Sequence, residues 1–246
     1  ISVSHDGTKD VNKYRLDKLG KETFNTVCEN IHLLEKNSIK TGLICTIVNS
    51  ALGHEKDIYE LLKTFHNLHF VKLNPCMDRN KDGSLPFWAI SPQQYFSFVE
   101  NFFDIMVKDG NWTNFYVEPI ISILKNLQSV NSSFCNYSLN KCNNFISLYP
   151  NGEITSCDNF DLKHGYLGNL NVLDNINDIL CMKYNKNLEN EYNLLMNQCV
   201  SCDIKDICKG GCIAIRERYT DTSSYCVSMH HMIRHIKNIY EKLKCE

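Results

Sequence analysis

The chain has 246 residues, of which 43% are hydrophobic and 22% are charged, and its formal net charge is −2. This composition is typical of a folded protein and excludes a disordered one, and the small net charge excludes a global basic field that would attract nucleic acid or anionic lipid. No apolar run approaches the roughly 18 residues of a membrane span. From the charge and the lack of such a run, we expect neither a nucleic acid nor a membrane as a partner.

Strand and helix patterns alternate in the first part of the chain. The expected elements are, in chain order, a strand end at Ile1–Ser4, a helix from Phe24 to Leu34 after a possible N-cap at Thr23, a strand at Thr41–Val48, a helix from Ile58 to Phe65, a strand at Leu68–Leu73 and a helix near Pro92. Three βα units predict a parallel α/β sheet. Three strands leave a bare edge, so we expect residues before Ile1 to supply the rest of the sheet.

The sequence changes character after residue 110. Residues 116–127 are predicted to form a bridging helix, and from Cys135 the chain is rich in Cys, Asn and Gly. Two short strands, at Phe145–Tyr149 and Glu153–Ser156, are expected to pair through a Pro-Asn-Gly turn. Helices are predicted at Tyr184–Met196 and at the C-terminus. The predicted domains are therefore 1–110, a bridge at 111–134, and 135–246.

Thirteen cysteines are the most unusual feature of the composition. The number is odd, and a chain of this length does not need disulfides to replace a core. The sequence does not open with the basic and then apolar segments of a signal peptide. We therefore expect metal-binding thiols in a cytoplasmic protein from an anaerobic or strongly reducing environment.

Eight of these cysteines are spaced in a way that indicates two sites of four thiolates. They are Cys135, Cys142 and Cys157, the run Cys199-x2-Cys202-x5-Cys208-x3-Cys212, and Cys226. Three interpretations are open: two iron–sulfur clusters, two structural zinc sites, or scattered buried cysteines. Zinc ribbons usually contain two x2 pairs in each site, whereas this run contains one, and this favours iron–sulfur clusters.

The same pattern resembles the SPASM domain of radical S-adenosylmethionine (SAM) enzymes. Seven cysteines and Gly152 fall in register with that domain. The residues around them also match its pattern, for example in Cys208-Lys-Gly-Gly-Cys212. The segment Ser2-Val-Ser-His-Asp6-Gly7, followed by Tyr14-Arg15, resembles the fourth strand of the radical SAM barrel and its loop. The resemblance implies an α/β fold: the C-terminal half of a partial (β/α)6 barrel, followed by a small cysteine-rich α+β SPASM domain.

The resemblance also implies two auxiliary 4Fe–4S clusters. The implied ligands are Cys135, Cys142, Cys157 and Cys212 for the first cluster, and Cys199, Cys202, Cys208 and Cys226 for the second. One family feature is missing, because the x3, x2 cysteine triplet of the SAM-cleaving cluster is absent. We therefore expect this chain alone not to cleave SAM, whereas the full-length enzyme is expected to bind SAM and a third 4Fe–4S cluster.

Several further residues match functional positions of the family. Ser4 and Arg15 would contact the ribose and carboxylate of SAM, although a strand-end serine and a surface arginine would explain them equally well. Leu73 could pack on adenine. Asp158 corresponds to the general base of the similar anaerobic sulfatase maturases, or it caps the following loop. The histidines near these positions, His5 among them, are expected on the surface or in loops, and the Asp-Gly step after His5 is expected to shape a turn.

The expected function is that of a radical SAM/SPASM maturase, which abstracts hydrogen from a peptide or protein side chain. The first hypothesis is thioether or carbon–carbon cross-linking of a ribosomally made peptide, with flavodoxin or ferredoxin as electron donor. The alternative is an anaerobic sulfatase maturase that makes formylglycine, which Asp158 favours slightly. A third hypothesis, of another class, is a non-catalytic metal-binding module that recognises peptides.

Overall fold

The structure is a computed structural model, and it describes residues 1–110, 115–139, 145–159, 165–173, 175, 177–179, 188–218 and 222–245. The chain forms two compact units, which are Ile1–Leu124 with Ser223–Glu246, and Lys125–Thr222. The last helix therefore belongs with the first unit, whereas the boundaries expected from the sequence placed it in the cysteine-rich part. No helix in the described ranges is long and apolar enough to cross a membrane.

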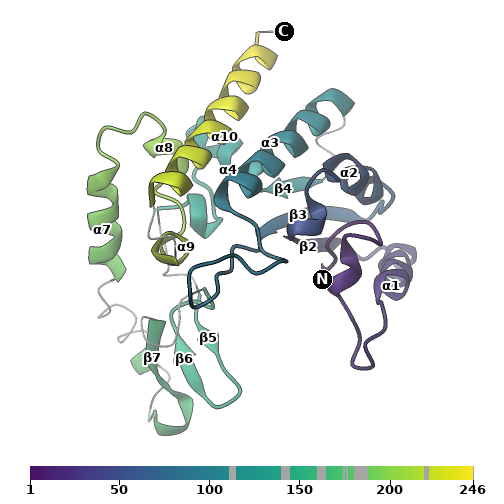
Figure 1. Ribbon diagram of the computed structural model, residues 1–246, viewed down its shortest axis with the longest axis horizontal. Helices are drawn as coiled ribbons and strands as arrows, with labels where there is room; N and C mark the ends of the chain where they lie inside the picture. The colour runs from purple at the N-terminus through teal and green to yellow at the C-terminus, as the bar shows by residue number, and fades with distance from the viewer. Residues whose placement is uncertain are drawn as a thin grey trace. The chain divides into compact units, whose positions relative to one another are not determined.

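The first unit contains a parallel sheet with helices between its strands (Figure 1). Its main elements are β1 (Ser2–Ser4), α1 (Phe24–Lys36), β2 (Thr41–Ile47), α2 (Glu55–Lys63), β3 (Leu68–Pro75), α3 (Pro92–Asp109), β4 (Tyr116–Glu118), α4 (Ile120–Leu127) and α10 (Thr222–Leu243). The strand order is β1-β2-β3-β4, and all neighbouring strands run parallel. The predicted parallel α/β architecture is confirmed.

The fourth strand, β4, is a difference from the predicted elements. A helix from Tyr116 is wrong at its start, because Tyr116 pairs with Phe70 of β3 and the helix begins only at Ile120. Glu118 precedes Pro119, and the residue before a proline is biased towards extended backbone. The Glu118-Pro119 step was therefore the indication of a strand that the sequence offered. The apolar residues after Pro119 have helical spacing, and for this reason the whole segment was predicted as a helix.

The two faces of the sheet have different environments. Side chains alternate along a strand, and on β2 and β3 one set is closed off from solvent: Leu43, Cys45, Ile47, Val71 and Leu73 are at most 2% exposed. The other set is partly exposed. It includes a row that crosses the sheet in register, Ser4 beside Ile44 beside Lys72. The open face therefore carries the polar side chains Ser4 and Lys72 on either side of the apolar Ile44.

Helix α3 begins and ends as its sequence dictates. The Ser91 hydroxyl accepts the Gln94 N–H at 3.2 Å, the Gln94 side chain accepts the Ser91 N–H at 2.9 Å, and Pro92 occupies the first turn. This reciprocal pair satisfies two amide donors that a helix start leaves unpaired. Gly110 ends the helix in the left-handed region, with φ 70°.

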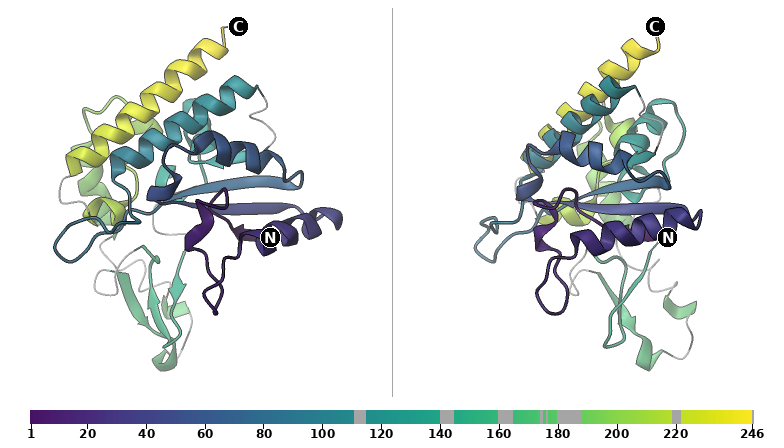
Figure 2. Two further views of the ribbon diagram at one scale, coloured as in Figure 1. Left: turned by 45° about the vertical axis from the view of Figure 1, so that its right-hand side comes forward. Right: turned by 90° about the vertical axis from the view of Figure 1, so that its right-hand side faces the viewer.

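Helix α10 runs alongside α3 in both views of Figure 2. The rings of Phe96 and Tyr225 meet edge to face at 5.2 Å, and Asp104 contacts His235 Nε2 at 2.6 Å. Because partners further along α3 meet partners further along α10, the two helices run in the same direction. These contacts explain why the last helix joins the first unit.

The second unit is built from short elements. They are η3 (Cys135–Tyr137), β5 (Ser147–Leu148), β6 (Glu153–Thr155), β7 (Tyr166–Asn169), η4 (Leu170–Val172), α7 (Leu188–Gln198), α8 (Lys205–Cys208) and α9 (Ile213–Arg218). The predicted hairpin is confirmed as β5 and β6, and β7 adds an antiparallel strand that was not predicted. The predicted helix at 184–196 is described from Leu188 onward, and residues 184–187 lie outside the described ranges.

The hairpin turn depends on Gly152. Its φ of +84° lies in the left-handed region, and a Cβ there would lie 2.5 Å from Asn171 Nδ2. Both the backbone conformation and the close side chain therefore require glycine at this position.

The aromatic core of the first unit allows a test of its packing. Phe102 is fully buried and meets Tyr59 edge to face at 5.7 Å. We expect Phe102→Ala to reduce the free energy of unfolding by about 3–5 kcal/mol, because the substitution leaves a cavity. Phe87→Ala, at a side chain that is 69% exposed, should change this energy by no more than about 0.5 kcal/mol. Urea unfolding followed by circular dichroism measures both, and equal losses would contradict the described core.

Candidate cofactor sites

A cavity in the second unit brings together three cysteines that are far apart in the sequence. Cys135 on η3, Cys157 after β6 and Cys212 before α9 all line it. Cys157 and Cys212 also pack against the same small buried cluster, Ile213 and Ala214. These are three of the four ligands expected for the first cluster. The fourth, Cys142, lies outside the described residues.

The backbone before Cys212 makes a sharp reversal between α8 and α9. Gly210 and Gly211 have φ values of 82° and 70°, which favour glycine, and they follow directly on Lys209 at 52°. A Cβ on Gly210 would also lie 3.1 Å from Leu195 Cδ2. The two glycines therefore allow Cys212 to turn back to the cavity that Cys135 and Cys157 line.

The surroundings of Cys157 include the candidate base. Burial raises the pKa of the Cys157 thiol, the Asp158 carboxylate raises it further, and the Asn159 N–H, 3.5 Å from Sγ, lowers it. The Cys157 thiol donates to Asp158 Oδ1 at 3.4 Å, and Asp158 itself is exposed. Both chain neighbours of Asp158 line the cavity. The carboxylate thus lies at the margin of the cysteine cavity and faces solvent.

The second group of cysteines occupies consecutive turns of chain. The Cys202 N–H donates to the Cys199 carbonyl at 3.0 Å, and the Cys208 N–H, at the end of α8, donates to the carbonyl of Ile204, the residue before that helix, at 2.8 Å. The pKa of Tyr192 is raised by burial first, and then by the nearby sulfurs of Cys199 and Cys208. Two of the expected ligands of the second cluster therefore influence the same tyrosine.

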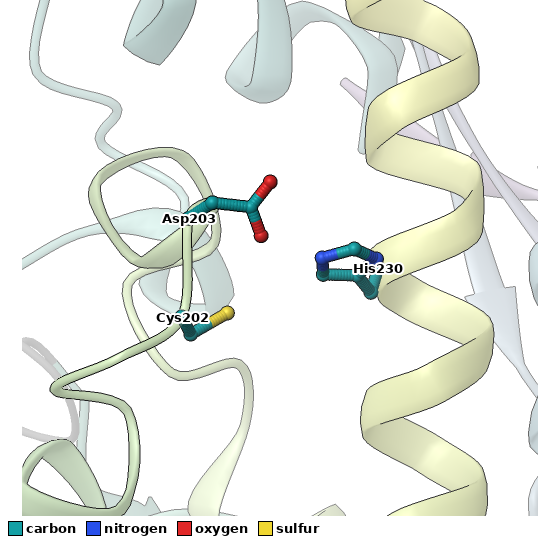
Figure 3. A group of neighbouring side chains, drawn as sticks. All are labelled: Cys202, Asp203 and His230. Atoms are coloured by element: carbon teal, nitrogen blue, oxygen red, sulfur yellow. The ribbon is translucent and has the colours of Figure 1, made fainter.

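The remaining expected ligand of that cluster belongs to the other unit. Cys226 lies on α10, as does His230, whereas Cys202 and Asp203 come from the segment that leads into α8 (Figure 3). The complete second set of four ligands therefore stays a prediction. None of the eleven cysteines that the structure describes is disulfide-bonded.

In the first unit, Arg15 is held by a residue whose role the sequence did not indicate. Arg15 Nη2 donates to Asp6 Oδ1 at 2.7 Å and to Thr46 Oγ1 at 3.4 Å, and the Thr46 N–H donates to the same Asp6 oxygen at 2.8 Å. Asp6 is only 5% exposed, so it anchors an ion pair rather than merely shaping a turn. Nothing distinguishes it in the sequence from an ordinary turn aspartate before glycine.

Arg15 also has an unsatisfied donor. Its Nε is buried and has no hydrogen-bond partner within the described part of the chain. Such a donor is costly when it stays unpaired, and a water molecule or a ligand acceptor would satisfy it. A carboxylate suits this position, because a guanidinium offers several donors in one plane.

The other two expected SAM contacts lie on different faces of the sheet. Ser4 is exposed at the end of β1, on the open face. Leu73 is 2% exposed on the closed face, and its carbonyl accepts the Tyr95 O–H at 2.7 Å. This burial does not favour a contact between the Leu73 side chain and adenine. Asn74, the next residue, is the one whose side chain lies on the open face.

His5 is not on the surface, as was expected, but fully buried. Its ring lies 5.4 Å from that of Phe24 and 5.9 Å from that of Phe65, and its Nε2 is 3.4 Å from Cys28 Sγ. Burial lowers the pKa of His5 to about 4, while Asp6 raises it and Arg15 lowers it by smaller amounts. His5 does lie in a loop, directly after β1. The surface alternative is wrong, because a residue at the end of a parallel strand can still point into the core.

Comparisons with known proteins agree with this architecture. No family model matches the chain. The serine-type anaerobic sulfatase-maturating enzyme of Bacteroides thetaiotaomicron is 23% identical over 273 residues, covering 100% of this chain and 64% of the relative. The cysteine-type enzyme of Clostridium novyi is 25% identical over 257 residues, covering 98% of this chain and 64% of the relative. The chain thus spans about 64% of the length of these curated relatives.

Solved structures show the same fold. Native anSMEcpe with bound AdoMet superposes with a TM-score of 0.74 at 23% identity, covering 97% of this chain and 67% of that one. The same protein with AdoMet and the Kp18Cys peptide gives a TM-score of 0.70 at 22% identity, covering 98% of this chain and 69% of that one. The chain is homologous to the anaerobic sulfatase-maturating enzymes. The expected fold, part of a radical SAM barrel followed by a C-terminal domain, is confirmed.

The buried His5 predicts a pH dependence of stability. Its pKa is about 4 in the folded chain and about 6.5 when unfolded. The unfolded chain therefore takes up the proton first, and stability is lost as the pH falls from 6.5 to 4. We expect His5→Gln to remove up to about 3 kcal/mol of this loss, at about 1.4 kcal/mol per pKa unit.

Urea unfolding at a series of pH values measures the slope. His54→Gln is the matched control, because that side chain is 48% exposed and pairs with Asp57 on the surface. Identical slopes for the wild type and the His5 variant would contradict the buried neutral histidine.

Proposed function

We propose that this chain is part of a radical SAM enzyme of the anaerobic sulfatase-maturating type, which oxidises a serine or cysteine side chain of a sulfatase to formylglycine. The observation that carries the proposal is the cavity at which Cys135, Cys157 and Cys212 meet. The homology to both serine-type and cysteine-type maturating enzymes supports this substrate class. The peptide bound to a solved relative supports a peptide or protein substrate.

The cysteines suit two four-thiolate clusters. The proposed ligands are Cys135, Cys142, Cys157 and Cys212 for one 4Fe–4S cluster, and Cys199, Cys202, Cys208 and Cys226 for the other. Thiols that line one cavity and are not disulfide-bonded have the donor chemistry that iron–sulfur clusters or zinc require. When bound, fully ligated clusters supply an acceptor for one electron. The cysteines hold them, and ligation would also tie together loops that have little apolar core.

Arg15 and Ser4 are the proposed SAM contacts. The unpartnered Nε of Arg15 and the exposed Ser4 on the open face fit an amino-acid carboxylate and a ribose. When bound with its own cluster, SAM supplies a carbon radical that removes one hydrogen atom from the substrate. Arg15 orients the cofactor by its carboxylate, and Asp6 holds Arg15 in turn. Leu73 is not included, because its side chain is buried on the closed face.

Asp158 is the proposed general base. Oxidation of a serine or cysteine side chain to the aldehyde level removes a hydrogen atom from Cβ, a proton from the hydroxyl or thiol, and one electron. Asp158 is exposed beside Cys157, where a substrate can reach it, and it would accept the proton. Flavodoxin or ferredoxin is the proposed electron donor, and the reducing cytoplasm the proposed location.

The cross-linking of a ribosomal peptide, which was the first hypothesis from the sequence, has less support. The relatives named above are sulfatase-maturating enzymes, and none of those names mentions a cross-link. A non-catalytic zinc module remains the alternative of another class. Metal content separates it from the enzyme.

Anaerobic reconstitution with iron and sulfide tests the clusters. We expect a brown full-length protein in which this chain contributes about eight irons, because two four-iron clusters account for them. Cys212→Ala should remove about half of these, since Cys212 is assigned to the first cluster. Cys76→Ala is the matched control, because Cys76 is half-buried, and its N–H and carbonyl bind Ile47 and Ile90.

Iron and sulfide analysis with electron paramagnetic resonance measures the result. A colourless protein with two zinc ions would overturn the cluster assignment. If the Cys212 variant lost only the second cluster, which Cys199 helps to bind, the assignment of Cys212 to the first cluster would be overturned.

Product analysis tests the reaction. The full-length enzyme with SAM and a reductant should convert the serine of a sulfatase-derived peptide to formylglycine with the loss of two hydrogens. A cysteine should lose two hydrogens to give a thioaldehyde, which water hydrolyses to formylglycine with release of H2S. Mass spectrometry distinguishes both products from the unmodified peptides. Asp158→Asn should lower the rate by about 10²–10⁴-fold, as loss of a general base does. Asp206→Asn, at another exposed carboxylate of the same unit, should not lower it.

The peptides also discriminate between the hypotheses. A cross-linked product from a cognate precursor peptide, with no oxidation of the sulfatase peptide, would favour the first hypothesis from the sequence. Full activity of the Asp158 variant would refute the role of the base and leave the substrate assignment intact.

A further inference from the structure

The second unit contains a buried cation with no ion-pair partner in its described part. Arg216, on α9, is only 4% exposed. Its Nη1 donates to the Gly210 carbonyl at 3.1 Å and its Nη2 to Gln198 Oε1 at 3.5 Å, and both of these acceptors are neutral. Its Nε is buried and has no hydrogen-bond partner.

This arrangement is energetically unfavourable by itself. A guanidinium remains charged in a protein, and a charge removed from water is costly unless a group of opposite sign lies near it. Among the carboxylate side chains that the structure describes, none forms an ion pair with Arg216. A negative group other than these carboxylates is therefore needed to compensate Arg216.

The contacts of Arg216 indicate where that group binds. Gly210 lies midway between Cys208 and Cys212, in the loop whose two glycines turn the chain. Gln198 directly precedes Cys199. The Arg216 N–H itself donates to the Cys212 carbonyl at 3.1 Å. The guanidinium is thus held by the two segments that carry the ligands proposed for both clusters.

We infer that Arg216 is the buried countercharge of the auxiliary clusters and that it raises the reduction potential of at least one of them. The inference rests on the proposed function, because it requires the clusters. A cluster with four thiolate ligands carries a net negative charge, which grows when an electron is added. A nearby cation therefore stabilises the reduced form more than the oxidised form, and net charge is one of the factors that set cluster potentials.

This role matches what the proposed reaction needs. Oxidation of the substrate leaves one electron, and a cluster with a higher potential accepts it more readily. Arg216 touches neither the substrate nor the reacting atoms in this account. It acts through the cluster and is therefore a positioning and charge-compensating residue rather than a catalytic residue.

Two substitutions separate charge from packing. Arg216→Gln removes the charge and retains a hydrogen-bond donor for the Gly210 carbonyl, whereas Arg216→Lys retains the charge and loses the planar fork. Lys205→Gln is the matched control, because Lys205 is a partly exposed cation of the same unit that reaches the Val200 carbonyl at 3.4 Å. The full-length protein is reconstituted anaerobically, and iron content and cluster midpoint potentials are measured by a redox titration followed by electron paramagnetic resonance.

We expect Arg216→Gln to shift the midpoint potential of one or both auxiliary clusters to a lower value while iron content is retained. Arg216→Lys should restore most of the wild-type potential, and Lys205→Gln should shift it much less. Unchanged potentials in a fully loaded Arg216→Gln protein would overturn the inference. So would equal loss of iron in both Arg216 variants, because that result would mean that Arg216 only holds the loop. A wild-type protein without clusters would instead overturn the proposed function.

Discussion

The convergence of distant thiols on one cavity is the constraint on which the second unit depends. Cys135, Cys157 and Cys212 come from three separate segments, yet they line a single space. The apolar clusters described in this unit are small, such as Ile213 with Ala214. Short strands and turns with so little core need another source of order, and metal ligation can supply it because the binding free energy is also folding free energy.

The first unit differs from the second, because its stability comes from a well-packed apolar core rather than from metal ligation. This core covers one face of the sheet, and the other face stays open to a proposed ligand. Helices and apolar strand residues close one side of the sheet, with side chains such as Leu43 and Val71 fully buried. The other side presents Ser4, while Arg15 near the strand ends is anchored by Asp6. A rigid sheet that positions a guanidinium in this way is suited to hold an anionic group in one orientation.

Charge compensation links the two proposals. Arg15 is paired with Asp6 and still has a buried, unsatisfied donor, whereas Arg216 is almost fully buried and bonds only neutral oxygens. In a medium of low polarity, an acceptor or a negative charge from outside the side chains described would stabilise each arrangement. Arg15 suits the proposed SAM carboxylate, and Arg216 suits the proposed iron–sulfur clusters.

The sequence by itself determined the parallel α/β order, the hairpin of β5 and β6, and the set of candidate cysteine ligands. These follow from periodicity, turn residues and cysteine spacing respectively, which are local properties of the chain. Only the tertiary structure decided that β4 extends the sheet, that His5 is buried, that Leu73 faces the closed side, that Asp6 anchors Arg15, and that Arg216 is buried. Each of these depends on which neighbours surround a side chain after packing. Burial and pairing of that kind arise between segments distant in the chain, so no local pattern records them.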